Sequence, residues 1–298
     1  MHVLITGGSG FIGRALAREL LAQGHRVTVV SRHPGDARHV LPDAVGLVDD
    51  VARAPPDADA VVNLAGENLG QQRWNAARKR EFVASRAGTT RRLVEWMSVL
   101  PRKPAVLVSG SAVGYYGARG DEPLAEDAPA GSEYQSELCR TWEAEAQRAE
   151  ALGVRVCRIR IGIVLGPDGG ALASMKLPFR LGLGGYLGSG QQWMSWIHRA
   201  DLVSLILWLL AGPAQAGAYN ATAPQPARNR DFARALAASL HRPAVLPMPA
   251  PVVNLLVGEM AHLLLTGQKV LPARALAEGF RFRFPELDGA LQEIWRVG

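Results

Sequence analysis

The chain of 298 residues opens on an apolar strand that runs directly into a glycine-rich turn. The segment reads His2-Val-Leu-Ile-Thr-Gly7-Gly-Ser-Gly10-Phe-Ile-Gly13. The first of these spaced glycines allows a tight turn, the second lets backbone N–H groups approach a phosphate, and the third lets helix and strand pack closely. This pattern is typical of dinucleotide-binding proteins, in which a pyrophosphate lies at the positive N-terminus of the helix. A purely structural glycine turn is the alternative.

The residues after the turn support a strand–helix–strand unit. Ile12, Leu16 and Leu20 recur at helical spacing, and Gly24 is placed to end the helix. Residues 26–31 then form a second apolar strand. The glycines therefore lie in the context that a dinucleotide-binding turn requires.

Strands and helical patterns continue to alternate along the chain. Further strands are predicted at residues 45–48, 60–64, 105–109 and 154–161, and helices at 72–100 and 132–153. The second helix has a capping-box start at Ser132 and Gln135. This alternation predicts an α/β fold with a doubly wound parallel sheet of the Rossmann type.

The last part of the chain differs in texture. Glycine-rich sequence at about 166–200 predicts loops on the substrate side of a cleft. We assign residues 1–240 to the main domain and 241–298 to a small C-terminal module that closes the cleft. Alternating phenylalanines at 280, 282 and 284 indicate a strand in that module.

Composition narrows the class of protein. The 33 basic and 27 acidic residues give a net charge of +6, but the charges are scattered, so we expect a surface that accepts anionic cofactors and does not bind nucleic acid. Cys139 and Cys157 are predicted to be reduced and buried. No secretory leader is visible, and the apolar runs 202–211 and 252–265 are too short or interrupted to cross a bilayer. We expect buried helices there, a cytoplasmic protein without membrane contact, and a monomer or homodimer.

The end of the second strand indicates which cofactor is bound. An acidic residue at this place hydrogen-bonds the ribose 2′-hydroxyl of NAD, whereas this chain has Ser31 and Arg32, which suit a 2′-phosphate. NADP is therefore the expected cofactor. The alternative is that Arg32 is an ordinary exposed loop residue.

A set of motifs in fixed order resembles the extended short-chain dehydrogenase/reductases. They are Thr6-Gly-Gly-x-Gly-Phe-Ile-Gly13, Asn63-Leu-Ala-Gly66, Ser109-Gly-Ser111, Tyr134, Arg160-x-Gly-x-Val-Leu-Gly-Pro167 and Trp196-Ile-His-x-x-Asp-Leu202. More narrowly the chain resembles the atypical "epimerase family" branch. That likeness rests on Glu67-Asn68, Arg73-Trp-Asn75, Ser85-Arg86, Pro178-Phe-x-x-Gly-x-Gly-Gly185 and a short extra C-terminal module.

The resemblance implies a cofactor site. Gly7, Gly10, Phe11, Ile12 and Gly13 would hold the pyrophosphate, Ser31 and Arg32 the 2′-phosphate, and Leu64, Ala65 and Gly66 would lie beside the adenosine half and its ribose. Glu81 and Arg86 on the long helix would face the cofactor, and Ile163 would lie near the nicotinamide. Without the resemblance, Glu81 and Arg86 would be read as ordinary charges on a surface helix.

Catalysis in these relatives uses a serine, a tyrosine and a lysine one helical turn after the tyrosine, which lowers the tyrosine's pKa. Ser111 and Tyr134 are the candidate catalytic residues, but Leu138 stands at the lysine position. Tyr134 is therefore either an acid/base or an aromatic packed at the start of a helix. Tyr115 and Tyr116 are further candidates for substrate contact or for loop packing.

Other polar residues give weaker signals. His198 and Asp201 are interpreted as residues of a structural strand-to-helix turn, with a proton shuttle as the alternative. No histidine has the spacing of a metal ligand, so no metal is expected. Two functions fit. One is an NADP-dependent oxidoreductase or epimerase acting on a small substrate, for which sugar-linked and nucleotide-linked compounds are candidates. The other is an NADP(H)-binding sensor or regulatory protein with little or no turnover.

Overall fold

Seven parallel strands form the central sheet of the computed structural model, which describes residues 1–70, 72–243 and 246–297. Across the sheet the strands are β11 (Gly217–Ala221), β7 (Arg155–Ile161), β5 (Val106–Ala112), β4 (Ala60–Asn63), β1 (His2–Thr6), β2 (Arg26–Val30) and β3 (Gly46–Val48). The order reverses direction at β1, which lies between β2 and β4. The predicted α/β fold with a doubly wound parallel sheet is confirmed.

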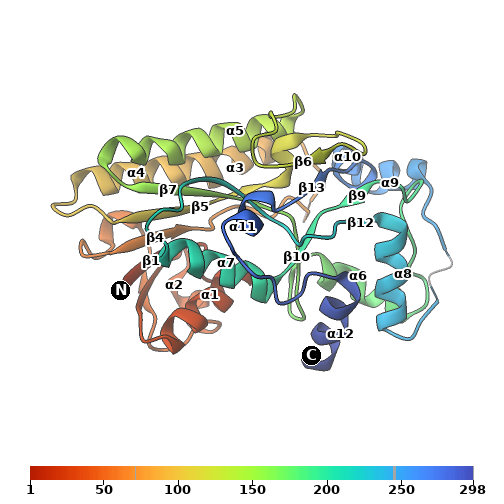
Figure 1. Ribbon diagram of the computed structural model, residues 1–298, viewed down its shortest axis with the longest axis horizontal. Helices are drawn as coiled ribbons and strands as arrows, with labels where there is room; N and C mark the ends of the chain where they lie inside the picture. The colour runs from red at the N-terminus through yellow and green to blue at the C-terminus, as the bar shows by residue number, and fades with distance from the viewer. Residues whose placement is uncertain (71, 244–245, 298) are drawn as a thin grey trace.

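Helices cover both faces of this sheet (Figure 1). One face carries α1 (Phe11–Ala22), α2 (Pro34–Arg38) and α7 (Arg199–Ala211), and the other carries α3 (Ala76–Val83), α4 (Thr89–Val99) and α5 (Tyr134–Gln147). The strands β1 and β4 are wholly buried, as expected for a sheet covered on both faces. Helix α1 ends where predicted, just before Gly24, which has a φ of +76°.

The long helix predicted at 72–100 is interrupted once. Asn75 caps α3 by accepting a hydrogen bond from the Arg78 N–H at 2.9 Å. A π-helical turn at Ala84–Gly88 then joins α3 to α4. Such a turn inserts one residue into the helix and frequently marks a functional site.

The chain beyond β7 forms a second layer of structure beside the sheet. Strand β8 (Ile163–Leu165) pairs in parallel with β10 (Trp196–His198). Strand β9 (Trp193–Met194) pairs in antiparallel with β12 (Ala227–Arg228). Helices α6 (Gly170–Arg180), α8 (Asn229–Ser239) and α12 (Leu287–Val297) lie beside them in Figure 1. Their buried apolar side chains form a core of their own around Trp196 and Phe232.

The C-terminal segment returns to the rest of the molecule. Strand β13 (Lys269–Val270) pairs with β6 (Pro123–Leu124), and α11 (Ala273–Ala277) contributes Ala275 to the core of the main sheet. Short 3₁₀ turns lie at Val51–Arg53, Val113–Tyr116, Arg148–Leu152 and Gly258–Met260. The division at residue 240 and the closing role of the module stay predictions, and positions 244, 245 and 298 of the module lie outside the described residues.

Three local predictions were wrong. The capping box at Ser132 does not form, because α5 begins at Tyr134 and its N-cap, Glu133, makes no side-chain capping bond. Residues 280–284 form no strand, because the Asp201 carboxylate accepts the backbone N–H groups of Arg283 and Phe284 at 2.8 and 2.9 Å in place of a strand partner.

The run 252–265 is also not one buried helix. It breaks at Gly258, where φ is +62°, into α9 (Ala250–Val257) and α10 (Ala261–Leu265), and Leu255 of α9 is 73% exposed. The run 202–211, by contrast, lies in α7 and is mostly buried, as predicted. None of the helices that the structure describes has both the length and the apolar character needed to span a bilayer.

Candidate functional site

A cavity of about 750 Å³ opens at the carboxyl ends of β1, β2 and β4. Ligands of open parallel sheets bind at this edge, beside the point where the strand order reverses. Eight of the predicted cofactor-binding residues line the cavity: Gly7, Gly10, Ser31, Arg32, Leu64, Ala65, Gly66 and Glu81. Most of the residues that the sequence predicts to bind the cofactor therefore line one continuous cavity.

The glycine turn at the base of the cavity requires glycine for two separate reasons. Gly7 has a φ of +71°, and a Cβ on it would lie 2.5 Å from the Leu64 carbonyl oxygen. A Cβ on Gly13 would lie 2.4 Å from the Gly7 carbonyl oxygen, so this glycine lets α1 approach the turn. Gly10 is the N-cap of α1, which has no acidic residue in its first turn. The turn thus presents free backbone N–H groups and a helix N-terminus to the cavity, which suits a phosphate.

Three predicted residues near this turn do not line the cavity. The Phe11 ring packs against Gly169 and Gly170, and the Arg199 guanidinium lies 4.7 Å from its centroid. Ile12 packs against the core of the sheet, and Gly13 lies under the turn. Phe11 therefore fixes the start of α1 against the loop after β8.

None of the three residues that directly follow β2, at positions 31–33, is acidic. Ser31 and Arg32 line the cavity, and the Arg32 side chain is 80% exposed. Its nearest charged partner is Glu67, at 3.7 Å. An exposed guanidinium at this place can meet a phosphate on the adenosine ribose.

Sequence reasoning missed the opposite wall of the cavity. Asp49, Asp50 and Val51 follow β3, and Arg92 of α4 forms an ion pair with Asp50. The Asp50 carboxylate accepts a hydrogen bond from the Ala52 N–H, and this bond, together with Arg92, holds its pKa below the usual value. Both aspartates follow the carboxyl end of a predicted strand, and that position was the available signal.

Arg86 lies just behind the cavity wall, on the π-helical turn. It donates to the Glu67 carbonyl oxygen at 2.9 Å, and a Cβ on Gly66 would lie 3.2 Å from its Cζ. The same guanidinium stacks over the Trp142 ring of α5 at 5.5 Å. Burial lowers the pKa of Arg86. Glu81, one turn earlier, lines the cavity and forms an ion pair with Arg78.

Ile163, predicted near the nicotinamide, is the first residue of β8 and packs against the core around Trp196. It does not line the cavity described above. The cavity extends from the glycine turn to the end of β2, and the position of Ile163 relative to the nicotinamide stays a prediction.

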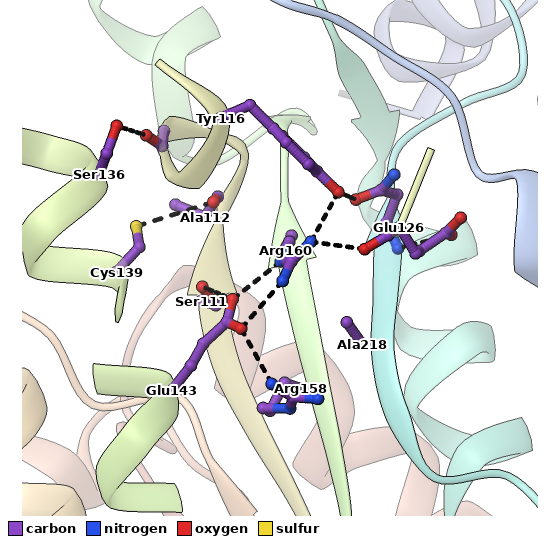
Figure 2. Close-up of polar contacts among 12 residues, drawn as sticks. Ser111, Ala112, Tyr116, Glu126, Ser136, Cys139, Glu143, Arg158, Arg160 and Ala218 are labelled. Atoms are coloured by element: carbon purple, nitrogen blue, oxygen red, sulfur yellow. Dashed lines mark hydrogen bonds and ion pairs between the residues drawn. The ribbon is translucent and has the colours of Figure 1, made fainter. Parts of the chain in front are cut away.

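Ser111 belongs to a buried charge network between the sheet and α5 (Figure 2). Its hydroxyl donates to Glu143 Oε1 at 2.7 Å. Arg160 donates to both carboxylate oxygens, with Nε at 2.9 Å from Oε1 and a terminal nitrogen at 3.1 Å from Oε2. Arg158 adds a contact at 3.3 Å. The serine proton is thus directed at Glu143.

The same network includes the second tyrosine of the loop after β5. Tyr116 is fully buried, donates to Asn220 Oδ1 at 2.7 Å and accepts from Arg160 at 2.8 Å. Burial raises the pKa of Tyr116 to about 12. Tyr115 is half-buried, and its ring lies 3.5 Å from the Arg160 guanidinium carbon. Of the two readings, packing fits Tyr116.

Tyr134 is the first residue of α5 and contacts α3. Its hydroxyl donates to the Lys79 carbonyl oxygen at 3.1 Å, and its ring lies 5.6 Å from Trp74. Burial raises the pKa of Tyr134, and the charge of Arg86 opposes that rise. Leu138, which stands where the relatives have the lysine, is buried, with 4% of its surface exposed. Among the described residues, no hydrogen bond joins Tyr134 to Ser111.

His198 and Asp201 have structural roles. His198 Nδ1 accepts the Ala200 N–H at the start of α7, and its ring stacks on Phe284 at 4.1 Å. Asp201 holds the backbone of Arg283 and Phe284. Within the described part of the chain, no cluster of histidine, cysteine and acidic residues could hold a metal ion.

Comparison with known proteins gives two family matches. The NAD dependent epimerase/dehydratase family matches residues 3–222, and a domain of unknown function, DUF1731, matches residues 248–294. The bovine epimerase family protein SDR39U1 is 44% identical, over 99% of each chain. A chloroplastic homologue from Arabidopsis thaliana is 43% identical, over 99% of this chain and 86% of the relative.

A solved structure agrees with these matches. The crystal structure of the human epimerase family protein SDR39U1 with NADPH superimposes with a TM-score of 0.91 over 99% of each chain, at 41% identity. A UDP-glucuronic acid 4-epimerase from Bacillus cereus superimposes with a TM-score of 0.80 at 16% identity, which is evidence for the fold alone.

Proposed function

Because this chain belongs to the NAD dependent epimerase/dehydratase family, we propose that it binds NADP(H) in the cavity at the carboxyl ends of β1, β2 and β4. The observation that carries the proposal is the cavity itself. It joins the glycine turn of Gly7 and Gly10 to Arg32, and β2 ends without the acidic residue that would select NAD. The human relative crystallised with NADPH is consistent with this choice.

In this arrangement the backbone N–H groups of the glycine turn bind the pyrophosphate, and Ser31 with Arg32 binds the 2′-phosphate. Leu64, Ala65 and Gly66 lie beside the adenosine half and its ribose, while Glu81 faces the cofactor from the long helix and Arg86 lies on the same side behind Gly66. The bound cofactor supplies a hydride. The site is built to place a doubly charged phosphate against a cation that has few competing contacts.

The test is a calorimetric titration with NADPH and NADH. We expect NADPH to bind at least about tenfold more tightly, which is about 1.4 kcal/mol. Arg32→Ala should remove that preference and leave NADH binding in place. Arg18→Ala is a matched control, because Arg18 is an exposed arginine of α1 outside the cavity. Equal affinities of the wild type for the two cofactors, or unchanged NADPH binding by Arg32→Ala, would refute the 2′-phosphate contact.

For the chemistry we propose an oxidoreductase or epimerase-like reaction on a small substrate, with sugar-linked and nucleotide-linked compounds as the first classes to test. Tyr134 is the proposed acid/base, and Ser111 is its proposed partner. NADPH consumption over a panel of aldehydes, ketones and sugar nucleotides measures this, and Tyr134→Phe should abolish it. Turnover that survives Tyr134→Phe at every pH would remove Tyr134 from the mechanism.

A second function is favoured by three observations. The Ser111 hydroxyl is directed at Glu143, the Tyr134 hydroxyl at the Lys79 carbonyl, and Leu138 replaces the lysine. These contacts suit an NADP(H)-binding sensor with little or no turnover. Tight NADPH binding without consumption across the whole panel would select the sensor.

The remaining expectations are proposals as well. We propose a monomer or homodimer that binds neither nucleic acid nor membranes and resides in the cytoplasm. The Arabidopsis relative is chloroplastic, so the relatives do not share one compartment. Fractionation of the source cells and light scattering of the purified protein test these points.

A further inference from the structure

The loop after β4 carries a carboxylate whose backbone is held beside the cofactor cavity. The Ser85 hydroxyl accepts the Glu67 N–H at 3.1 Å, and Arg86 donates to the Glu67 carbonyl oxygen at 2.9 Å. Both partners lie on the π-helical turn between α3 and α4. Glu67 lines the cavity, and its side chain is 25% exposed. The π-helical turn therefore fixes the point from which the Glu67 carboxylate projects.

This carboxylate lies between two arginines that come from different elements. Its Oε2 is 3.7 Å from Arg32, which follows β2, and its Oε1 is 3.4 Å from Arg78 of α3. The Arg32 side chain is 80% exposed, whereas that of Arg78 is 13% exposed and stacks over the buried Phe82 ring at 5.2 Å. An exposed ion pair is weak, while a partly buried one is less screened by solvent. Glu67 thus has one loosely held cation and one fixed cation.

The loosely held cation is the one that the 2′-phosphate of NADP(H) needs. Among residues 1–70, 72–243 and 246–297, Glu67 is the only carboxylate that pairs with Arg32. A carboxylate and a phosphate both bind a guanidinium through charge-assisted hydrogen bonds, and two such anions repel each other at close range. A 2′-phosphate that binds Arg32 must therefore replace the contact with Glu67.

We propose that Glu67 sets the strength of the preference for NADPH over NADH, because its carboxylate competes with the cofactor's 2′-phosphate for Arg32. This inference rests on the proposed NADP(H) binding. Arg78 limits the competition, since it stays paired with Glu67 after Arg32 has turned to the phosphate. NADH carries a 2′-hydroxyl in place of the phosphate and does not have to displace Glu67 from Arg32. The ratio of the two affinities is therefore lower than Arg32 alone would give.

The ratio of NADPH to NADH affinity, measured by calorimetric titration, reports on this competition. We expect Glu67→Gln to raise the ratio about fivefold, which is about 1 kcal/mol. The glutamine has nearly the same size and keeps both backbone contacts of this position. Glu19→Gln is the matched control and should leave the ratio unchanged, because Glu19 is an exposed glutamate of α1 outside the cavity. A general loss of stability would weaken the binding of both cofactors alike and would not move the ratio.

Arg78 provides a second, independent measurement. Arg78→Met leaves Glu67 with Arg32 as its only cation, so the ratio should fall at least about twofold. In the double variant Glu67→Gln with Arg78→Met no carboxylate competes for Arg32, and the ratio should match that of Glu67→Gln alone. If Arg78→Met does not fold, Arg78→Gln removes the same charge and takes its place in the comparison.

Two results would overturn the proposal. One is an unchanged or lower ratio in Glu67→Gln, and the other is an equal fall of the ratio when Arg78→Met is introduced into Glu67→Gln and into the wild type. Failure of the proposed function looks different. A wild type that binds NADPH no more tightly than NADH, or an Arg32→Ala variant that keeps the preference, refutes the 2′-phosphate contact itself and the role of Glu67 with it.

Discussion

Glu143→Gln removes the negative charge from a carboxylate that is only 3% exposed. In the wild type this group accepts hydrogen bonds from Ser111, Arg158 and Arg160, and the contact with Arg160 is bidentate. Burial alone would lower the pKa of Arg160, but the hydrogen bond and charge of Glu143 raise it above its usual value. The substitution therefore leaves a buried guanidinium without its counter-ion.

Breaking a buried ion pair from one side costs about 3–5 kcal/mol. That is a large share of the roughly 5–15 kcal/mol by which a domain is stable. At about 2–4 °C per kcal/mol, we expect the melting temperature to fall by about 6–20 °C. Ser111→Ala removes one hydrogen bond from the same carboxylate and should cost only about 1 kcal/mol.

Urea unfolding followed by tryptophan fluorescence measures both losses. Trp142 adjoins Glu143 in α5 and is itself 6% exposed, so its emission reports on this layer. The double variant Glu143→Leu with Arg160→Met should be more stable than Glu143→Gln, because it removes both charges. If Glu143→Gln loses less than about 1 kcal/mol of unfolding free energy, or if the double variant is less stable than Glu143→Gln, the ion pair is not desolvated.

Two further predictions concern the C-terminal part. Burial, followed by the charge of Arg199, lowers the pKa of His198 to about 4, so between pH 6.5 and 4 the unfolded chain takes up the proton first and stability falls. Urea unfolding should show the wild type losing about 3 kcal/mol more than His198→Asn over this range, and parallel curves would refute the shift. Leu291→Ala creates a cavity where α12 meets the core around Trp196 and should cost about 2–5 kcal/mol by the same assay, whereas a loss under 1 kcal/mol would mean that α12 is not anchored there.

The sequence predicted the sheet well because its strands are short apolar runs between glycines and helical patterns. Strand β11 was missed, since Gly217-Ala-Tyr-Asn-Ala221 contains few apolar side chains and is a strand only because it pairs with β7. The phenylalanines at 280 and 282 have the spacing of a strand, but their rings pack against each other at 4.9 Å. Pairing and packing of this kind depend on residues far away in the chain.

The candidate site was predictable to a similar degree. The glycine turn and Arg32 follow directly from the ends of predicted strands, because that position faces the ligand in any parallel sheet. The direction of the Ser111 and Tyr134 hydroxyls could not be inferred, since it is set by Glu143 and by the Lys79 backbone. The place of Arg86 depends on the π-helical turn, for which the sequence carries no clear signal.

The pairing of β6 with β13 bears on how the protein folds during synthesis. Strands β1, β2, β3 and β4 find their partners among residues that emerge from the ribosome together. Leu124, in contrast, pairs with Val270, which lies 146 residues later in the chain (270 − 124). A nascent chain can therefore assemble the glycine turn early, while the segment after β5 waits until Val270 has been translated. The glycine turn and the β6–β13 pair are therefore completed at different times.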